Sequence, residues 1–210
     1  MNFEEYLEAL ADSSRPLKIA ELQRLSDLSP EEAEQFAARW PDLDVRRRRH
    51  ILQELIDLAE DTVELDFDAV SRHALKDNDS EVRLAAVRGL WEYESVDLID
   101  DLTALAETDD DAAVRAEAAL ALGRFVLLFE TGRLRERHFE RAAAVLRRVV
   151  ENAGEIEEVR VRAVEAIGPH DAGWVRQALT QAYESGSHRL KVSAVHAMGR
   201  SAEPRWLPLI

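Results

Sequence analysis

Four consecutive arginines, Arg46 to Arg49, form the longest run of like charges in the sequence. Guanidinium groups hold phosphates and carboxylates through paired hydrogen bonds, so such a run could bind a phosphorylated ligand or an acidic peptide. On a helix, however, consecutive side chains point around most of the circumference, and only about two of the four can share a face. We therefore interpret the run as structural: Arg46 serves a ladder of contacts between repeated helices, and the other three pair with nearby Glu and Asp.

Two acidic runs, Asp100–Asp101 and Asp109 to Asp111, contain the residue type that calcium prefers, but their spacing does not match a D-x-D-x-D-G loop. The six histidines are scattered, and the sequence has no cysteine and no H-E-x-x-H motif. It also lacks a Gly-rich phosphate loop, a G-x-S-x-G motif and a dinucleotide fingerprint. We expect no catalytic residue, no metal and no cofactor.

The segment 79–91, DSEVRLAAVRGLW, indicates the kind of element that must carry these side chains. Its apolar residues, among them Val82, Ala86 and Leu90, follow the i, i+3, i+4 spacing of one helical face. Asp79 and Ser80 precede them and are good N-cap residues. The segment is predicted to be an amphipathic helix with a defined start.

This pattern recurs along the chain, at 111–123, 157–168 and 187–199, with a partial copy at 44–47. The apolar residues that anchor the copies are 37, 32, 45 and 31 residues apart, and they are Val45, Val82, Val114, Val159 and Leu190. A period of this size is typical of helical repeat arrays. The long step of 45 predicts one repeat with two lengthened helices.

The pattern x-V-R-x-x-A-x-x-A-[LI]-G resembles the second helix of HEAT repeats, especially the short bacterial HEAT-like kind found in PBS-lyase-type proteins. The resemblance covers most of the chain, from about Arg15 onward. It implies an all-α fold, a right-handed α-solenoid (α-α superhelix) of about six HEAT-like helical hairpins. It also implies a ladder of Asp and Arg side chains along the stack, which Asp79/Arg83 and Asp111/Arg115 could reproduce.

We expect residues 1–210 to form a single repeat domain. The approximate repeats are 1–28, 29–61, 66–93, 96–129, 134–168 and 171–199, with 203–210 as the start of a truncated further repeat. A stack end without a polar cap exposes apolar surface. The end is therefore expected either to continue in a longer protein or to dock onto a partner or a second copy of the chain.

Individual residues predict where helices begin, end and cross. Ser29, Pro30 and Glu32 form a capping-box start, and Pro16 is expected near the first position of the second helix. Alanines are expected where helices cross closely, at Ala86, Ala119, Ala163 and Ala194. Glycines are expected to end helices in a left-handed conformation, at Gly123, Gly168 and Gly199. Tryptophans are expected to fill the space between repeats, at Trp40, Trp91, Trp174 and Trp206.

The net charge of −15 is unevenly distributed. Residues 1–50 carry 8 bases and 11 acids, residues 51–110 carry 4 and 18, and residues 111–210 carry 15 and 13. The acidic block disfavours nucleic acid and favours a basic partner surface. The N-terminal segment lacks the pattern of a signal peptide and no apolar run is long enough for a membrane span, so we expect a cytoplasmic protein.

Our leading hypothesis is a non-enzymatic protein–protein interaction scaffold that binds a partner segment on the concave face built by the second helices. The polar residues assigned to that face are Arg47, Arg48, Glu54, Arg88, Glu92, Arg124, Arg162 and His196. One alternative follows from the resemblance, because similar repeats occur in phycobilin chromophore lyases: the chain would be a lyase or lyase subunit. The other is a nucleic-acid-binding protein similar to HEAT-like DNA glycosylases, which the acidic block opposes.

Overall fold

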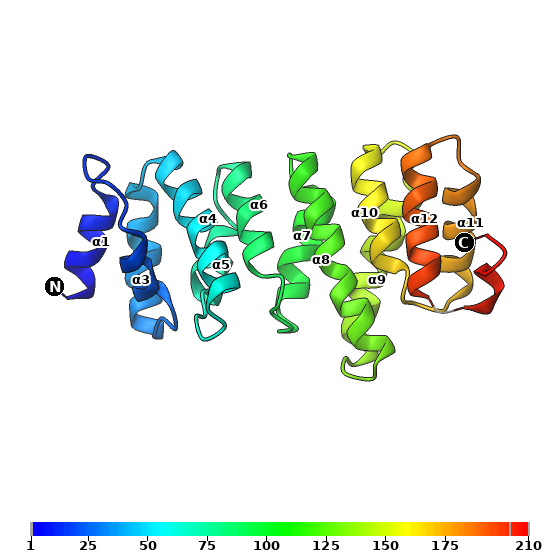
Figure 1. Ribbon diagram of the computed structural model, residues 1–210, viewed down its shortest axis with the longest axis horizontal. Helices are drawn as coiled ribbons and strands as arrows, with labels where there is room; N and C mark the ends of the chain where they lie inside the picture. The colour runs from blue at the N-terminus through cyan, green and yellow to red at the C-terminus, as the bar shows by residue number, and fades with distance from the viewer. Residues whose placement is uncertain (1, 202, 210) are drawn as a thin grey trace. The chain divides into compact units, whose positions relative to one another are not determined.

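The computed structural model describes residues 2–201 and 203–209, and every regular element in these residues is helical. The chain divides into two compact units, residues 1–93 and 94–210. Ile210, the last residue of the segment 203–210 predicted to open a further repeat, lies outside the described residues, as do Met1 and Ala202. Figure 1 shows the helices coloured from the N-terminus to the C-terminus.

Unit 1 contains three helix pairs. Their bounds are α1 (Phe3–Ala11), α2 (Ile19–Leu22), α3 (Pro30–Arg39), α4 (Val45–Asp61), α5 (Asp68–Ala74) and α6 (Ser80–Gly89), with short 3₁₀ turns at Gln23–Leu25 and Trp40–Asp42. The first helices pack in the order α1, α3, α5, and the second helices pack in the order α2, α4, α6. This side-by-side stacking of equivalent helices is the architecture of a HEAT-like α-solenoid.

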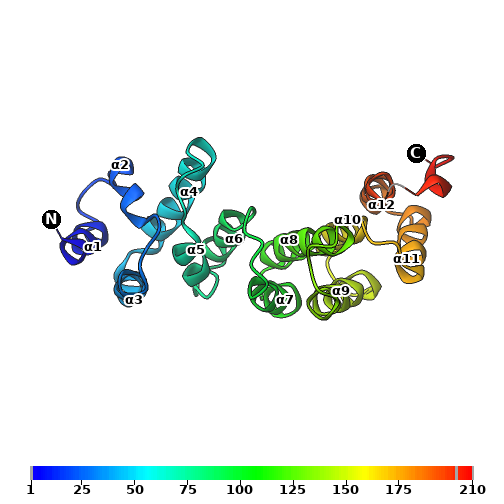
Figure 2. The same ribbon diagram turned by 90° about the horizontal axis from the view of Figure 1, so that it is seen from below.

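Unit 2 repeats this arrangement with longer helices. Their bounds are α7 (Leu98–Thr108), α8 (Ala112–Glu130), α9 (Glu136–Glu151), α10 (Glu157–Ile167), α11 (Gly173–Glu184) and α12 (His188–Arg200), followed by a 3₁₀ turn at Pro204–Trp206. In Figure 2 the second helices α8, α10 and α12 form one layer of this unit, and α7, α9 and α11 form the other. The lengthened helices α8 and α9 account for the repeat step of 45 residues.

Local sequence sets most helix starts. The predicted capping box is confirmed, because the Ser29 side chain accepts from the Glu32 amide and the Glu32 carboxylate reaches back to the Ser29 amide. Asp79 caps α6 by accepting from the Val82 amide at 3.1 Å. The second helix is an exception: it begins at Ile19 instead of Pro16, and only four residues are α-helical.

The predicted helix-ending role of glycine is wrong at Gly123 and Gly199, which lie inside α8 and α12. At Gly168 a helix does end, but the backbone is right-handed, with φ −49°. The reason is close packing: a Cβ atom built on Gly123 would lie 2.9 Å from the Ala166 Cα atom, and one on Gly168 would lie 2.8 Å from the Ala197 Cα atom. These glycines let neighbouring second helices approach backbone to backbone.

The remaining small and aromatic residues largely follow the prediction. The four alanines expected at helix crossings are fully buried, and they are Ala86, Ala119, Ala163 and Ala194. Trp40 and Trp206 are buried as expected of residues that fill space between helices. Trp91 is not, since 58% of its surface is exposed.

A ladder of ion pairs connects successive second helices, and it includes Asp79 and Arg115 of the predicted residues. Arg49 donates to both carboxylate oxygens of Asp79, at 2.8 and 2.6 Å, so Arg49 and not Arg46 carries this step. In unit 2, Arg115 makes the same bidentate contact with Glu155, donating to its two carboxylate oxygens at 3.2 and 2.9 Å. Each arginine therefore reaches the acid that precedes the following second helix, and each step joins two repeats.

These pairs predict that acid destabilises the fold. Hydrogen bonds from Arg49 lower the pKa of Asp79, and those from Arg115 lower the pKa of Glu155. A carboxyl group whose pKa is lower in the folded state contributes stability above its unfolded pKa, near 4, and loses it as the pH falls through the folded value. We expect the midpoint temperature of thermal unfolding to fall when the pH is lowered below about 4. The fall should be smaller in Arg115→Met.

The measurement is the midpoint of thermal unfolding between neutral pH and pH 3 for the wild type and Arg115→Met. Arg141→Met is the control, because the Arg141–Asp100 pair is more than half exposed on both sides and contributes little. An acid response of Arg115→Met equal to that of the wild type would contradict the assignment of the effect to Glu155.

Candidate functional site

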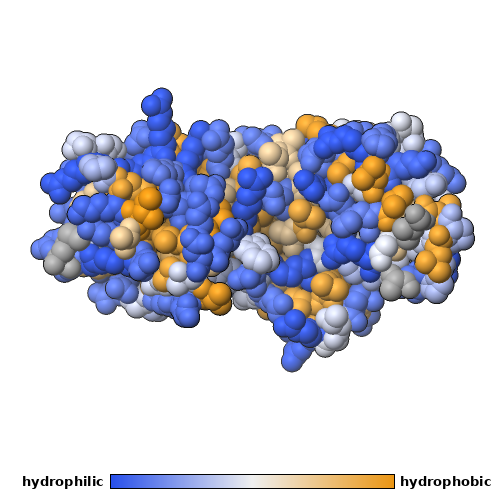
Figure 3. All heavy atoms as spheres, viewed as in Figure 1, coloured by the Kyte–Doolittle hydropathy of each residue, from blue (hydrophilic) through white to orange (hydrophobic). Residues whose placement is uncertain are grey.

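A groove opens between α10 and α12 on the second-helix layer of unit 2. One wall comes from α10 and the other from the first half of α12, and the lining residues are Glu158, Val161, Arg162, Glu165, His188, Arg189, Val192 and Ser193. In Figure 1 both helices face the viewer, in front of α9 and α11. The space-filling view of this face mixes charged and apolar surface over α10 and α12 (Figure 3).

The polar lining forms one connected network. Arg162 lies between two acids of its own helix, with Nε 3.3 Å from a Glu158 oxygen and Nη1 3.0 Å from a Glu165 oxygen. Arg189 of α12 pairs with Glu158, and the Ser193 hydroxyl donates to Glu165 at 2.8 Å. The network therefore bridges the two helices and fixes the orientation of both arginines.

The groove also presents apolar surface. Val161 is buried and lines the bottom of the groove. The Val192 side chain faces solvent, and 54% of the surface of this residue is exposed. The Arg189 and Arg162 side chains remain 56% and 41% exposed, so both can still donate to a ligand. An apolar centre with charged groups around it suits a polypeptide segment better than a small buried substrate.

Two of the sequence-predicted site residues lie in or beside this groove. Arg162 is part of the network, and His196 is exposed one helical turn beyond Val192 on the same face of α12. Arg124 of α8 is only partly exposed. Its burial lowers the pKa of the guanidinium to about 10, and the group lies 5.0 Å from the Phe125 ring centre.

The other five predicted residues belong to unit 1. Arg47 donates to three backbone carbonyl oxygens, and Arg48 pairs with Asp77 in a buried site. Glu54 lies 3.1 Å from His50, on the exposed part of α4. Arg88 and Glu92 are exposed. The assignment of all eight residues to a partner stays a prediction.

The arginine run is structural as interpreted at Arg48 and Arg49, whereas the roles predicted for Arg46 and Arg47 are wrong. Arg48 and Arg49 pair with acids of the following repeat, at Asp77 and Asp79. Arg47 instead binds the carbonyl oxygens of residues 10, 12 and 15. The run therefore connects α4 to both of its neighbouring repeats.

Sequence reasoning did not single out most of the groove. Arg162 lies four residues after Glu158 and three residues before Glu165. Helical spacing alone therefore places these three side chains on one face of the helix. Arg189 and Val192 lie in the next copy of the repeat, at 187–199, and both side chains are exposed. They come close to α10 only because the repeats stack, and the local sequence pattern does not predict this contact.

The structure also bears on membrane and metal sites. No helix among residues 2–201 and 203–209 is long and apolar enough to cross a membrane. Within the same residues, no three His, Asp or Glu side chains are arranged to hold a metal ion.

Comparison with known proteins relates part of the chain to a repeat family. Residues 68–157 match the family model for HEAT repeats. This stretch runs from α5 through α9 and includes the helix pattern of residues 79–90 on which the resemblance rested. A search of curated proteins found no match.

Proposed function

Because this chain carries HEAT repeats, we propose that it is a non-enzymatic scaffold whose second-helix face holds an extended segment of a partner protein. Repeat solenoids provide long, continuous surfaces of this kind, and HEAT repeats generally mediate protein–protein interaction. The groove between α10 and α12 is the observation that carries the proposal, since it combines exposed apolar surface with oriented charged groups.

The groove has the composition of a binding surface. Val192 supplies an exposed apolar contact, and burying it under a partner removes apolar area from water. Arg189 and Arg162 flank it, and arginine is enriched among residues that contribute most to binding. Because Glu158 and Glu165 already fix these arginines, a partner loses less side-chain entropy on binding them.

The charge of the two units supports a basic partner. Unit 1 has 12 bases and 22 acids, a net charge of −10, and unit 2 has 15 bases and 20 acids, a net charge of −5. An acidic surface attracts a basic segment and accelerates its association. Binding is therefore expected to weaken as ionic strength rises, because salt screens exposed charges over about 10 Å at 0.1 M.

A site-specific cross-link tests this proposal. A photoreactive amino acid in place of Val192 should cross-link to a discrete protein in native cell extract. The same substitution at Val63, which is 87% exposed in unit 1, is the control for non-specific contact. The Val192 adduct should lose most of its yield in Arg189→Ala and keep it in Arg141→Ala. Arg141 is a matched control, since its side chain is 57% exposed, as against 56% for Arg189, and it also pairs with one acid.

Equal adducts at Val192 and Val63, or equal losses with the two arginine variants, would contradict the assignment to the groove. The same captured material distinguishes the alternatives. Bilin absorbance on the adduct would favour a chromophore lyase, and competition by duplex DNA at moderate salt would favour nucleic-acid binding, because phosphate contacts weaken steeply with salt.

A further inference from the structure

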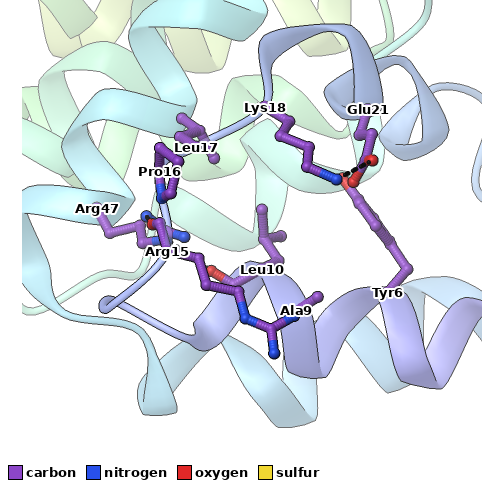
Figure 4. Close-up of a pocket in the computed structure, with 9 residues that line it drawn as sticks. All are labelled: Tyr6, Ala9, Leu10, Arg15, Pro16, Leu17, Lys18, Glu21 and Arg47. Carbon is purple, nitrogen blue, oxygen red and sulfur yellow. Dashed lines mark hydrogen bonds and ion pairs between the residues drawn. The ribbon is translucent and has the colours of Figure 1, made fainter.

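A second concave site lies in unit 1, apart from the proposed groove. It is a small hollow of about 80 Å³ that is partly open to solvent, bounded by α1, the loop before α2, α2 itself and one side chain from α4 (Figure 4). The lining residues are Tyr6, Ala9, Leu10, Arg15, Pro16, Leu17, Lys18, Glu21 and Arg47. This volume is below the range of about 300–1,000 Å³ that is usual for drug-sized ligands, so the hollow suits only a ligand of a few non-hydrogen atoms.

The Tyr6 hydroxyl is the unusual group in this pocket. The residue is only 2% exposed, and no group among the described residues hydrogen-bonds to its hydroxyl oxygen. In Figure 4 the side chain rises along one side of the pocket and ends beside the Lys18–Glu21 ion pair. A buried polar group without a partner is unfavourable and is rare in native proteins, so a missing partner is indicated.

The hydroxyl keeps its proton at neutral pH and can therefore donate a hydrogen bond to an acceptor. Burial raises the pKa of Tyr6 above its ordinary value near 10, and the nearby Arg24 opposes this only in part. The Arg24 guanidinium also covers the ring face, 4.4 Å from its centre. The phenol therefore stays protonated and points its donor into a positively charged surrounding.

The charge of the lining identifies the acceptor. Arg15, Lys18 and Arg47 are cationic, whereas the lining has one acid, Glu21, which pairs with Lys18. Asp12, beside the pocket, pairs with Arg15, so three cations face two acids in a unit of net charge −10. Lys18 has three donor hydrogens, and its contact with Glu21 at 2.9 Å leaves others available. An anionic oxygen beside Tyr6 would accept from both groups.

We propose that this pocket binds a small aliphatic carboxylate. The carboxylate accepts from the Tyr6 hydroxyl and from Lys18, and its short apolar body lies against Leu10, Pro16 and Leu17. The same chemistry can come from a free small acid or from the C-terminal carboxylate of a polypeptide. This site is independent of the protein-binding groove in unit 2.

The pocket wall is held in place before a ligand arrives. Arg47 Nε donates to the Leu10 carbonyl at 2.7 Å, and its terminal nitrogens donate to the carbonyls of Arg15 at 2.9 Å and Asp12 at 3.0 Å. These three bonds fix the turn that carries Arg15, Pro16 and Leu17. Preorganisation of this kind lowers the entropy that a small ligand loses on binding.

Isobutyrate is the probe for the first experiment, titrated into the ¹⁵N-labelled full chain. Backbone amide signals of Ala9, Leu10 and Leu17 should shift and report the affinity. Tyr6→Phe should weaken binding at least about tenfold, because it removes one charge-assisted hydrogen bond. The thermal midpoint of Tyr6→Phe should equal or exceed that of the wild type, since the ring stays and only an unpartnered hydroxyl is lost.

Matched variants and probes make the outcome decisive. Tyr183→Phe, in unit 2, should bind isobutyrate like the wild type, whereas Lys18→Met should bind it more weakly. Isobutyramide, which has the same shape without the charge, should bind at least about tenfold more weakly. A tripeptide ending in Val, compared with its amide, separates the two sources: tighter binding than isobutyrate assigns the site to a chain end, and no binding assigns it to a free acid.

Three results would overturn the proposal. They are an absence of shifts at the three pocket amides across the titration, equal affinities of wild type and Tyr6→Phe, and equal affinities of isobutyrate and isobutyramide. A lowered thermal midpoint in Tyr6→Phe would also count against it, because it would show that the hydroxyl already has a favourable partner in the free chain.

Discussion

Replacement of Asp77 by alanine is expected to lower the free energy of unfolding of unit 1 by about 3–5 kcal/mol. The carboxylate has no exposed surface and accepts from three groups: Trp40 Nε1 at 2.6 Å, Arg48 Nη1 at 2.5 Å and the Asp79 amide at 2.9 Å. Removing it leaves the buried indole N–H without its acceptor, and leaves the buried Arg48 charge with only a long hydrogen bond to the Asn78 side-chain oxygen at 3.4 Å. The large effect comes from these stranded partners and not from the loss of one contact.

Chemical denaturation of the wild type and Asp77→Ala measures this effect. Asp42→Ala is the matched control, since Asp42 also pairs with an arginine, Arg39, but 58% of its side chain is exposed. That variant should lose no more than about 1 kcal/mol. Similar losses in the two variants would show that the Asp77 site is open to water and that its partners are solvated when the carboxylate is absent.

Gly123→Val should destabilise unit 2 by about 3 kcal/mol, the upper part of the range for overpacking. A Cβ atom at this position would lie 2.9 Å from the Cα atom and 3.2 Å from the carbonyl oxygen of Ala166, both of which belong to the backbone of α10. A backbone cannot rotate out of the way as a side chain can, so α8 and α10 must separate. That separation also loosens the alanine contacts along the same crossing.

Gly199→Val provides the comparison, because Gly199 is also helical but its Cβ position has no atom of the described residues within 4 Å apart from its chain neighbours and the backbone of its own helix. Valine has a higher helix propensity than glycine, so this variant should be unchanged or slightly more stable, within about 0.5 kcal/mol. Thermal unfolding of both variants checks the difference. A neutral Gly123→Val would mean that α8 and α10 can move apart without losing their packing.

Local sequence predicts most of this fold because each second helix contains its own signals. Asp79 and Ser187 precede apolar residues at helical spacing, and both cap the helices that follow. Gly123 shows the limit of such signals. Glycine occurs both at helix ends and where two backbones approach closely. At Gly123 the second role applies because of Ala166, which is 43 residues away in the sequence.

The functional sites are less predictable for a related reason. Helical spacing places Arg162 beside Glu158 and Glu165, but only the stacked structure adds Arg189 from α12. The Tyr6 pocket depends on a loop and on Arg47 together. In both cases a surface forms from residues about 30 to 40 positions apart, which neither composition nor local periodicity specifies.

The contacts of Arg47 have a consequence for the order in which the protein folds. Its three carbonyl partners lie 32 to 37 residues earlier in the chain, so the turn after α1 receives its main hydrogen bonds from a helix made later. Contacts of this separation form after a loop-closure step, whereas the first helices form locally. During synthesis, the pocket around Tyr6 is therefore shaped only once α4 has emerged and docked, so the proposed carboxylate site is incomplete in a nascent chain that ends before α4.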